Sequence, residues 1–275
     1  MRAEEGTYAL KIYRANRWST AQVAWEQDLA AHLLRADLTD TVGVPLRDGR
    51  LVGEIASPEG TRPFALTEWA TAPKPTPPFS DELYRSFGAV VAGFHSRADG
   101  LRSAHPLRPF DALSALDAPR RRVRDALTAL ERRADADLVE VEGQRTVDAL
   151  AELESRGLPR GIRHGDASLD NVRLTADGMR LHDFDLSGEG WPMSDLVGAL
   201  STPFAAAFLS GYRSVRSITD VELDALPALR AAELLRNLDF HLTDKVAIRG
   251  EESVAEGWVD AELDALRVIH ASRSA

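Results

Sequence analysis

The chain lacks cysteine, and this absence excludes several kinds of chemistry. None of its 275 residues is cysteine, so it can form no disulfide framework, thiolate metal site or cysteine nucleophile. No apolar run reaches the ~18–20 residues that a membrane-spanning helix needs. The first residues, MRAEEGTYALKIYR, contain no apolar segment typical of a secretory signal. We therefore expect a cytoplasmic protein with no membrane partner.

Basic residues are outnumbered by acidic ones. Lys and Arg total 33 against 43 Asp and Glu, which gives a formal net charge of −10. Affinity for nucleic acid rests mainly on neutralising phosphates, so this balance argues against nucleic acid as a partner. A cationic substrate is compatible with the acidity, and so is the simpler role of keeping the protein in solution. The charge alone therefore selects no substrate.

The first part of the chain predicts a small sheet with one helix. Ser19 and Gln22 form the S-x-x-Q pattern of a capping box, and the apolar residues behind it favour a helix that continues through Leu34. β-branched and aromatic residues favour strands on both sides of this helix. The strands are expected at residues 7–13, 51–56 and 64–69, with a turn at 57–63.

A proline-rich segment separates this part from the rest. Residues 71–80 (TAPKPTPPFS) contain four prolines, which resist both helix and internal strand and are typical of a semi-rigid linker. The arginines of residues 120–133 indicate a solvated helix face rather than a phosphate-binding patch. Helices are expected at residues 81–96, after Pro119, near 146–156 and at a few places after Asp195. The sequence thus predicts an N-terminal lobe at 1–70, a linker at 71–80 and a helical lobe at 81–275.

The most informative stretch is RHGDASLDNVRLTADGMRLHDFD. A D-G turn between two short apolar runs predicts a hairpin over residues 172–181. This hairpin would bring Asp166, Asn171, Asp183 and Asp185 to one end. Carboxylate and amide oxygens without a thiolate or a nearby second histidine suit a hard cation such as Mg²⁺. A metal on the donor phosphates and a carboxylate at the acceptor hydroxyl are what phosphoryl transfer requires. A chance cluster of surface carboxylates is the alternative.

The motif HGD-x4-N followed by HDFD resembles the signature of the aminoglycoside phosphotransferase and choline kinase superfamily. The resemblance implies an α+β, bilobal protein-kinase-like fold, with a small sheet-rich lobe and a larger helical lobe. It also implies Mg²⁺ as cofactor and ATP or GTP as phosphoryl donor. By this resemblance Asp166 is the catalytic base or orients the acceptor hydroxyl. Asn171 and Asp183 would bind Mg²⁺, and Asp185 would be a second carboxylate or an outer-shell group.

The resemblance extends over residues 7 to about 213. Lys11 resembles the strand lysine that touches the donor phosphates, and Glu26 resembles its helical ion-pair partner. His164 would hold the catalytic loop, and Asp195 would brace that loop from the next helix. His95 matches the end of the first large-lobe helix, and FLSGYR at 208–213 is also similar to family members. The hinge backbone that binds adenine would be formed by Glu68, Trp69 and Ala70. The Trp69 side chain is interpreted either as an adenine wall or as core packing.

One part of the family pattern is missing before Lys11. The fold normally places two strands and a glycine-rich phosphate-covering loop ahead of the lysine strand, whereas Gly6 is the only glycine before Lys11. A start assigned too late, a protein partner that covers the site and a degenerate nucleotide site would each explain this difference. The sequence does not rank these explanations.

Three functions are compatible with these residues. The leading hypothesis is a kinase that phosphorylates a hydroxyl of a small molecule, either an antibiotic, a sugar or an amino alcohol. The second is a kinase subunit that acts on Ser/Thr of a peptide or protein in a natural-product pathway, with a partner completing the nucleotide site. The third is a pseudokinase scaffold that keeps the fold without transfer.

Overall fold

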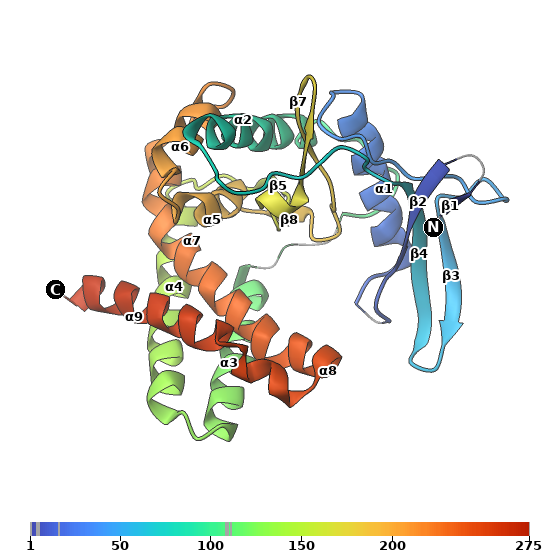
Figure 1. The fold of residues 1–275 in the computed structure, drawn as a ribbon. Helices are drawn as coiled ribbons and strands as arrows, with labels where there is room; N and C mark the ends of the chain where they lie inside the picture. The colour runs from blue at the N-terminus through green and yellow to red at the C-terminus, as the bar shows by residue number, and fades with distance from the viewer. Residues whose placement is uncertain (1, 4–5, 16, 108–109, 111, 275) are drawn as a thin grey trace. The chain divides into compact units, whose positions relative to one another are not determined.

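The computed structural model in Figure 1 describes residues 2–3, 6–15, 17–107, 110 and 112–274. The chain divides into two compact units, each built from two separate stretches. The mixed unit contains Met1–Pro109 and Arg160–Ile218, and the helical unit contains Phe110–Pro159 and Thr219–Ala275. These two units do not coincide with the lobes predicted at 1–70 and 81–275. The division into those lobes stays a prediction. In the described part of the chain, no helix is long and apolar enough to cross a membrane.

The sheet of the mixed unit has four antiparallel strands in the order β1-β2-β4-β3. The three predicted strands are confirmed, and β1 is a further two-residue strand that pairs with the start of β2. Residues 4–5, which join β1 to β2, lie outside the described residues. The strands are β1 (Arg2–Ala3), β2 (Gly6–Ile12), β3 (Val52–Ser57) and β4 (Gly60–Glu68).

The turn predicted at 57–63 is wrong in length. Ser57 pairs with Gly60, so β4 begins before the predicted 64 and includes Pro63. The carbonyl of Pro63 accepts the N–H of Tyr13 at 2.9 Å, on the side of β2. In a strand, the N–H and C=O of one residue point to the same side, so the N–H that Pro63 lacks would not have joined the ladder with β3. On the side of β2, Arg62 Nε donates to the carbonyl of Tyr13 at 2.9 Å, so this acceptor is satisfied without the N–H of Pro63 and proline is tolerated in the strand.

Helix α1 (Thr20–Leu34) packs on this sheet. Its predicted capping box is confirmed: Gln22 N donates to Ser19 Oγ at 3.2 Å, and Ser19 N donates to Gln22 Oε1 at 2.9 Å. Val23 of the helix forms a buried cluster with Val52 and Ala65 of the sheet. This apolar contact fixes the rotation of α1 about its axis, and so the direction in which its polar side chains point relative to the strands.

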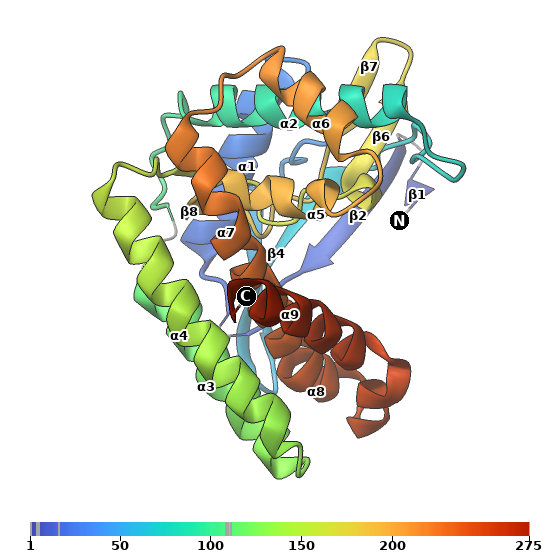
Figure 2. The ribbon, with the colours of Figure 1, turned by 90° about the vertical axis from the view of Figure 1, so that its left-hand side faces the viewer.

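The rest of the mixed unit carries two helices whose backbones approach closely. A Cβ added at Gly88 would lie 2.0 Å from the carbonyl oxygen of Phe208, and one at Gly211 would lie 1.8 Å from that of Arg85. Only glycine at both positions lets α2 and α6 lie side by side as Figure 2 shows. The elements of this part are α2 (Asp81–Ala98), β5 (Gly161–Arg163), η1 (Leu169–Asn171), β6 (Val172–Thr175), β7 (Gly178–Leu181), β8 (Gly188–Gly190), η2 (Pro192–Leu196), α5 (Val197–Leu200) and α6 (Ala205–Arg213).

Two predictions in this unit are confirmed. The hairpin at 172–181 is formed by β6 and β7, in which Thr175 pairs with Gly178. The proline-rich segment 71–80 contains neither helix nor strand. A second two-stranded pairing, between β5 and β8, holds the segment that precedes the HGD motif.

The helical unit packs its helices around a separate apolar core that includes Val123, Leu127 and Leu234. The predicted start after Pro119 is wrong, because the helix begins before this proline and runs through it. Apolar residues on both sides of Pro119 bury one face, and this packing outweighs the loss of one backbone N–H. The helix predicted at 146–156 is the end of a longer one. The elements are α3 (Ala112–Ala129), α4 (Arg133–Ser155), α7 (Asp220–Asp239), the π-helical turn η3 (Phe240–Asp244), α8 (Lys245–Arg249), η4 (Glu251–Glu256) and α9 (Trp258–Ser274).

The arginines at 120–133 mostly lie on a solvated helix face, as predicted. Arg121 and Arg122 have side chains that are 63% and 52% exposed. Arg120 is the exception, since only 11% of its side chain is exposed and it pairs with Asp117 and Glu140. The pair with Asp117 lies within α3, whereas the pair with Glu140 joins α3 to α4, so Arg120 stabilises the helical unit.

Candidate functional site

The HGD loop is held by a buried aspartate. Asp195, in η2, accepts the backbone N–H of His164 at 2.6 Å and that of Gly165 at 2.9 Å. Burial alone would raise the pKa of Asp195, but the hydrogen bond and charge of His95 outweigh it and lower the pKa to about 2. The carboxylate therefore stays ionised and accepts both loop N–H groups, although only 6% of the residue is exposed.

Asp195 is itself fixed by two residues from separate helices. His95 Nε2 lies 3.0 Å from Asp195 Oδ2, and His95 Nδ1 lies 2.9 Å from the Tyr212 hydroxyl. All three side chains are buried. The sequence predicted the place of His95 but not its connection to Tyr212. The sequence offered one signal for this contact: His95 in α2 and Tyr212 in α6 are polar residues on otherwise apolar helix faces.

Gly165 is required where two loops approach each other. Its φ is +86°, and a Cβ there would lie 2.3 Å from the carbonyl oxygen of Leu186. Any larger residue would push the HGD loop away from the segment that carries the DFD motif. Asp183 also has a positive φ, of 65°, which is uncommon for a residue other than glycine. The HGD and DFD motifs thus each contain one residue with a positive φ.

The side chain of Asp166 is clamped by Asn171. Asn171 Nδ2 donates to the carbonyl oxygen and to Oδ2 of Asp166, both at 2.9 Å. The amide nitrogen is used in this way, so the oxygen Oδ1 is the group that Asn171 can offer to a cation. The N–H of Asp166 points to His164 Nδ1 at 3.3 Å. The structure thus brings Asp166 and Asn171 together as the sequence predicted.

His164 is a structural member of the loop. Its ring lies 5.5 Å from that of Phe94 and 5.3 Å from that of Phe184, measured between centroids. Complete burial lowers the pKa of His164, so the ring is neutral at physiological pH and packs as part of the core. This geometry supports the predicted loop-holding role.

Lys11 lies between the carboxylates of the DFD motif. Its ammonium forms ion pairs with Asp183 and, at 2.9 Å, with Asp185. Burial lowers the pKa of Lys11, but the charges of Glu26, Asp185 and Asp183 outweigh burial and raise it. The structure therefore brings the lysine strand to the DFD motif, which are far apart in the sequence.

Glu26 is close to Lys11 without forming an ion pair with it. Among the ion pairs of the described residues, Lys11 is joined to the two DFD carboxylates and not to Glu26. Glu26 instead accepts the hydroxyl hydrogen of Tyr13 at 2.8 Å. Burial raises the pKa of Glu26 to about 7, although Lys11 and the Tyr13 hydroxyl oppose the rise. The predicted direct pair is thus replaced by a longer-range attraction.

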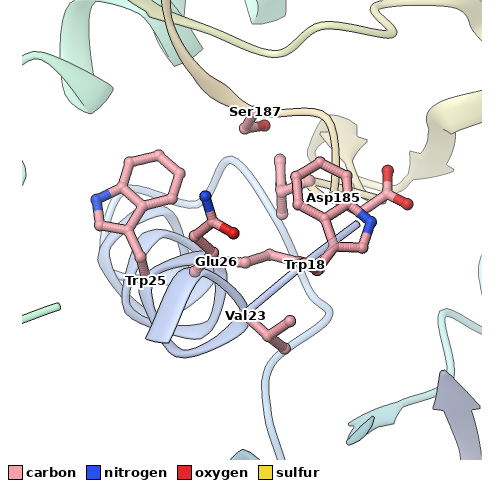
Figure 3. Close-up of a pocket in the computed structure, with 8 residues that line it drawn as sticks. Trp18, Val23, Trp25, Glu26, Asp185 and Ser187 are labelled. Carbon is pink, nitrogen blue, oxygen red and sulfur yellow. The ribbon is translucent and has the colours of Figure 1, made fainter. Parts of the chain in front are cut away.

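A small pocket of about 10 Å³ adjoins Glu26 and Asp185. Figure 3 shows Trp18 and Trp25 on either side of Glu26, with Ser187 across the pocket. The volume is about that of one water molecule, so this pocket is too small for a nucleotide or an acceptor. Sequence reasoning missed both rings, although two tryptophans beside a helical glutamate were a visible signal.

A larger cavity of about 400 Å³ opens beside Lys11. This volume is within the range of small-molecule and nucleotide sites. Its lining combines apolar side chains from the sheet and α1 with charged ones from the DFD motif. The lining includes Ala9, Leu10, Ala30, Trp69, Lys11 and Asp183.

The predicted hinge residues line this cavity as well. Glu68 N–H donates to Val42 O at 3.0 Å and Trp69 N–H donates to Thr7 O at 3.1 Å, so both donors are used within the protein. Among the described residues, no backbone acceptor is found for the N–H of Ala70. Trp69 is 54% exposed, so its side chain is not part of the core, and its role as an adenine wall stays a prediction.

The donor set suits a hard cation that keeps part of its own shell. Among the described residues, no three His, Cys, Asp or Glu side chains gather closely enough to hold a metal ion. Asp183 and Asn171 would supply a carboxylate and an amide oxygen. Mg²⁺ commonly takes one or two protein carboxylates and completes its shell with water and phosphate oxygens. The residues therefore fit Mg²⁺ and do not form an all-protein metal cage.

Comparisons with known proteins agree on one family. A model of the phosphotransferase enzyme family matches residues 2–231. An uncharacterized protein of Deinococcus radiodurans is 32% identical over 240 residues, 82% of this chain and 68% of that protein. A homoserine kinase of Sinorhizobium medicae is 27% identical over 250 residues, 84% of this chain and 71% of that enzyme.

Solved structures share the fold. A microcompartment-associated aminopropanol kinase matches with a TM-score of 0.77 and 21% identity, over 98% of this chain and 87% of that one. An amicoumacin kinase in complex with AMP-PNP and Ca²⁺ matches with a TM-score of 0.68 and 18% identity, over 96% of this chain and 82% of that one. The predicted α+β kinase-like fold is confirmed.

Proposed function

Because the chain belongs to the phosphotransferase enzyme family, we propose that it is a small-molecule kinase with Mg·ATP or Mg·GTP as donor and an amino alcohol as acceptor. Membership makes the chain a phosphotransferase with an alcohol group as acceptor. The donor nucleotide, the metal, the residue roles and the acceptor class are the parts we propose.

The observation that carries the proposal is the grouping of Asp166, Asn171, Asp183 and Lys11 in one unit. Asn171 fixes the carboxylate of Asp166, while Lys11 meets Asp183 at the wall of the large cavity. These are a positioned carboxylate, oxygen ligands for a hard cation and a lysine for phosphate oxygens. They are the parts that phosphoryl transfer requires, which argues against a pseudokinase.

The donor would bind in the large cavity. We assign adenine or guanine to the hinge at Ala70 and Trp69, and the α/β phosphates to Lys11. Asn171 Oδ1 and Asp183 would hold Mg²⁺, with Asp185 as a further carboxylate beside them. When bound, the metal neutralises the charge that develops on the transferred phosphoryl group and its leaving oxygen. AMP-PNP and Ca²⁺ in the related amicoumacin kinase support a nucleotide and a divalent cation.

Asp166 would act on the acceptor. Its carboxylate accepts a hydrogen bond from the acceptor hydroxyl and takes its proton as the new bond forms between the hydroxyl oxygen and the γ-phosphorus. The bond from the γ-phosphorus to the β–γ bridging oxygen breaks, and that oxygen leaves with the nucleoside diphosphate. Asn171 keeps the carboxylate in line with the acceptor, and Asp195 keeps the loop itself in place. Positioning of this kind supplies most of the catalysis in phosphoryl transfer.

An amino alcohol is the acceptor class that the relatives favour. Homoserine and aminopropanol, the substrates in the names of two relatives, both carry a hydroxyl group and an amino group. A cationic amino group is also compatible with the net charge of −10. The relatives give no support for a peptide acceptor or for a protein partner that completes the site.

The test is a kinase assay that measures nucleoside diphosphate release. Homoserine, aminopropanol, choline and an aminoglycoside are offered in turn with Mg·ATP or Mg·GTP. We expect turnover with an amino alcohol and a loss of about 10³-fold in kcat for Asp166→Asn, since general base catalysis contributes 10²–10⁴-fold. Turnover that is unchanged in Asp166→Asn would refute the proposed role, and turnover of the aminoglycoside alone would refute a small acyclic amino alcohol as the acceptor.

A further inference from the structure

A single buried tyrosine contacts both members of the predicted lysine–glutamate pair. Tyr13 follows Lys11 by two positions and comes directly after the end of β2, and its N–H continues the pairing with β4 by donating to Pro63 O. Both side chains therefore leave the backbone on the same face. The Lys11 ammonium lies 5.4 Å from the centroid of the Tyr13 ring. The Tyr13 hydroxyl donates to Glu26 Oε2 at 2.8 Å. Tyr13 therefore connects the strand cation to the helical carboxylate.

Packing alone does not require the hydroxyl of Tyr13. The residue is 3% exposed and packs in a cluster with Val23, Val52 and Ala65. A phenylalanine ring would fill the same apolar surroundings. A buried hydroxyl must find a hydrogen-bond partner, and in the described part of the chain this partner is Glu26. The hydroxyl thus serves the carboxylate rather than the core.

The backbone of Tyr13 is fixed at both of its polar groups. Its N–H donates to Pro63 O at 2.9 Å, and its carbonyl accepts from Arg62 Nε at 2.9 Å. With the backbone and ring both held, the hydroxyl stays at one point relative to the strand. Glu26 approaches this point from α1, so the hydrogen bond sets the distance between strand and helix at the lysine.

The hydrogen bond also favours the charged form of Glu26. Burial raises the pKa of Glu26 to about 7, whereas Lys11 and the Tyr13 hydroxyl oppose that rise. A donor stabilises a carboxylate over the neutral acid. The hydroxyl thus helps to keep a negative charge near Lys11 without a direct contact between the two.

We propose that Tyr13 is a positioning residue for the nucleotide-binding lysine. Its hydroxyl holds the Glu26 carboxylate toward Lys11, and its ring supports the lysine side chain, so that the ammonium faces the donor phosphates. This inference rests on the proposed function, because it presupposes that Lys11 binds the donor. Lys11 would contact the phosphates before and during transfer, so a loosened lysine raises the KM for nucleotide and leaves kcat nearly unchanged.

The test compares Tyr13→Phe with the wild-type protein. Calorimetry with Mg·ATP is expected to show about tenfold weaker binding, since a hydrogen bond to a charged group is lost. The nucleotide KM rises by the same factor, while kcat and the acceptor KM stay within about threefold. Tyr84→Phe is the matched control, because Tyr84 is also buried in the mixed unit and packs on Phe87 and Phe204. This control should change neither binding nor Tm.

A double-substitution cycle with Glu26→Leu, which removes the acceptor of the Tyr13 hydroxyl, separates positioning from packing. If the hydroxyl acts through Glu26, adding Tyr13→Phe to Glu26→Leu weakens nucleotide binding no further. Unchanged binding in Tyr13→Phe, effects that multiply in the double variant, or a loss that accompanies a large fall in Tm would each overturn the inference. A wild-type protein that binds no nucleotide would instead refute the proposed function, and the inference with it.

Discussion

The HGD loop and the lysine strand hold their charged groups in opposite ways. In the loop, Asp195 is 6% exposed and its oxygens are satisfied by two backbone N–H groups and His95. At the strand, the ion pair between Lys11 and Asp183 joins side chains that are 34% and 44% exposed. Buried charges depend strongly on their partners, whereas partly exposed ion pairs contribute little.

This difference assigns two tasks to two parts of the mixed unit. The loop is preorganised by buried hydrogen bonds, so Asp166 keeps its position whatever else binds. On the lysine side, the contact between Lys11 and Asp183 is partly exposed, so under the proposed function phosphate and metal would replace it at little cost. Substitutions should therefore affect stability on the loop side and nucleotide affinity on the lysine side.

The largest effect is expected at Asp195. Asp195→Asn removes the charge that accepts two loop N–H groups and faces His95, so the free energy of unfolding should fall by roughly 3 kcal/mol. Denaturant unfolding followed by circular dichroism measures this change. A substitution that leaves both stability and kcat intact would contradict the bracing role.

The pH dependence of the free energy of unfolding should report the lowered pKa of Asp195. A carboxyl whose folded pKa lies below its ordinary value stabilises the fold above that value and loses the contribution as the pH falls. For Asp195 the window lies between its ordinary 3.8 and about 2, and the contribution is roughly 2 kcal/mol. The stability gap between wild type and Asp195→Asn should therefore narrow as the pH falls from 4 to 2. A gap that stays constant would show that the charge of Asp195 contributes nothing.

Lys11→Met should have the opposite profile. We expect the KM for nucleotide to rise by about tenfold or more, because a phosphate contact is lost. The Tm should stay within a few degrees of wild type, since the pairs of Lys11 are partly exposed. Steady-state kinetics measure the KM for nucleotide, and thermal unfolding measures the Tm. A large loss of Tm would show that the lysine side also holds the fold together.

The smallest effect is expected at an exposed pair on the HGD loop. Lys74 Nζ lies 2.6 Å from Asp170 Oδ1, with side chains that are 52% and 80% exposed. Lys74→Met should change the free energy of unfolding by less than about 0.5 kcal/mol, as a denaturant titration would show. A loss comparable to that of Asp195→Asn would remove the distinction between buried and exposed pairs.

Much of the fold was predictable because its signals are local. The capping box at Ser19 and the hairpin at 172–181 depend on residues that are close in sequence. The starts of α3 and β4 were predicted too late because prolines 119 and 63 were taken as breaks. At Pro119 the packing of neighbouring residues outweighs the local preference of proline, and at Pro63 the missing N–H does not face β3.

For the candidate site, the HGD and DFD motifs predicted Asp166, Asn171 and Asp183 from their fixed spacing, and the structure places Asp166 and Asn171 in contact. The hydrogen bonds from His95 to Tyr212 and to Asp195 were not predictable, because they join residues that are 117 and 100 positions apart. Contacts of this kind depend on how helices pack, and no local pattern encodes them.

The most direct test of the account is a calorimetric titration of the protein with Mg·ATP and Mg·GTP, with Asp183→Ala as the control. We expect binding in the micromolar to low millimolar range that the control loses, because Asp183 would hold the metal on the phosphates. Absence of binding, or equal binding by Asp183→Ala, would contradict the claim that these residues form a working nucleotide and metal site.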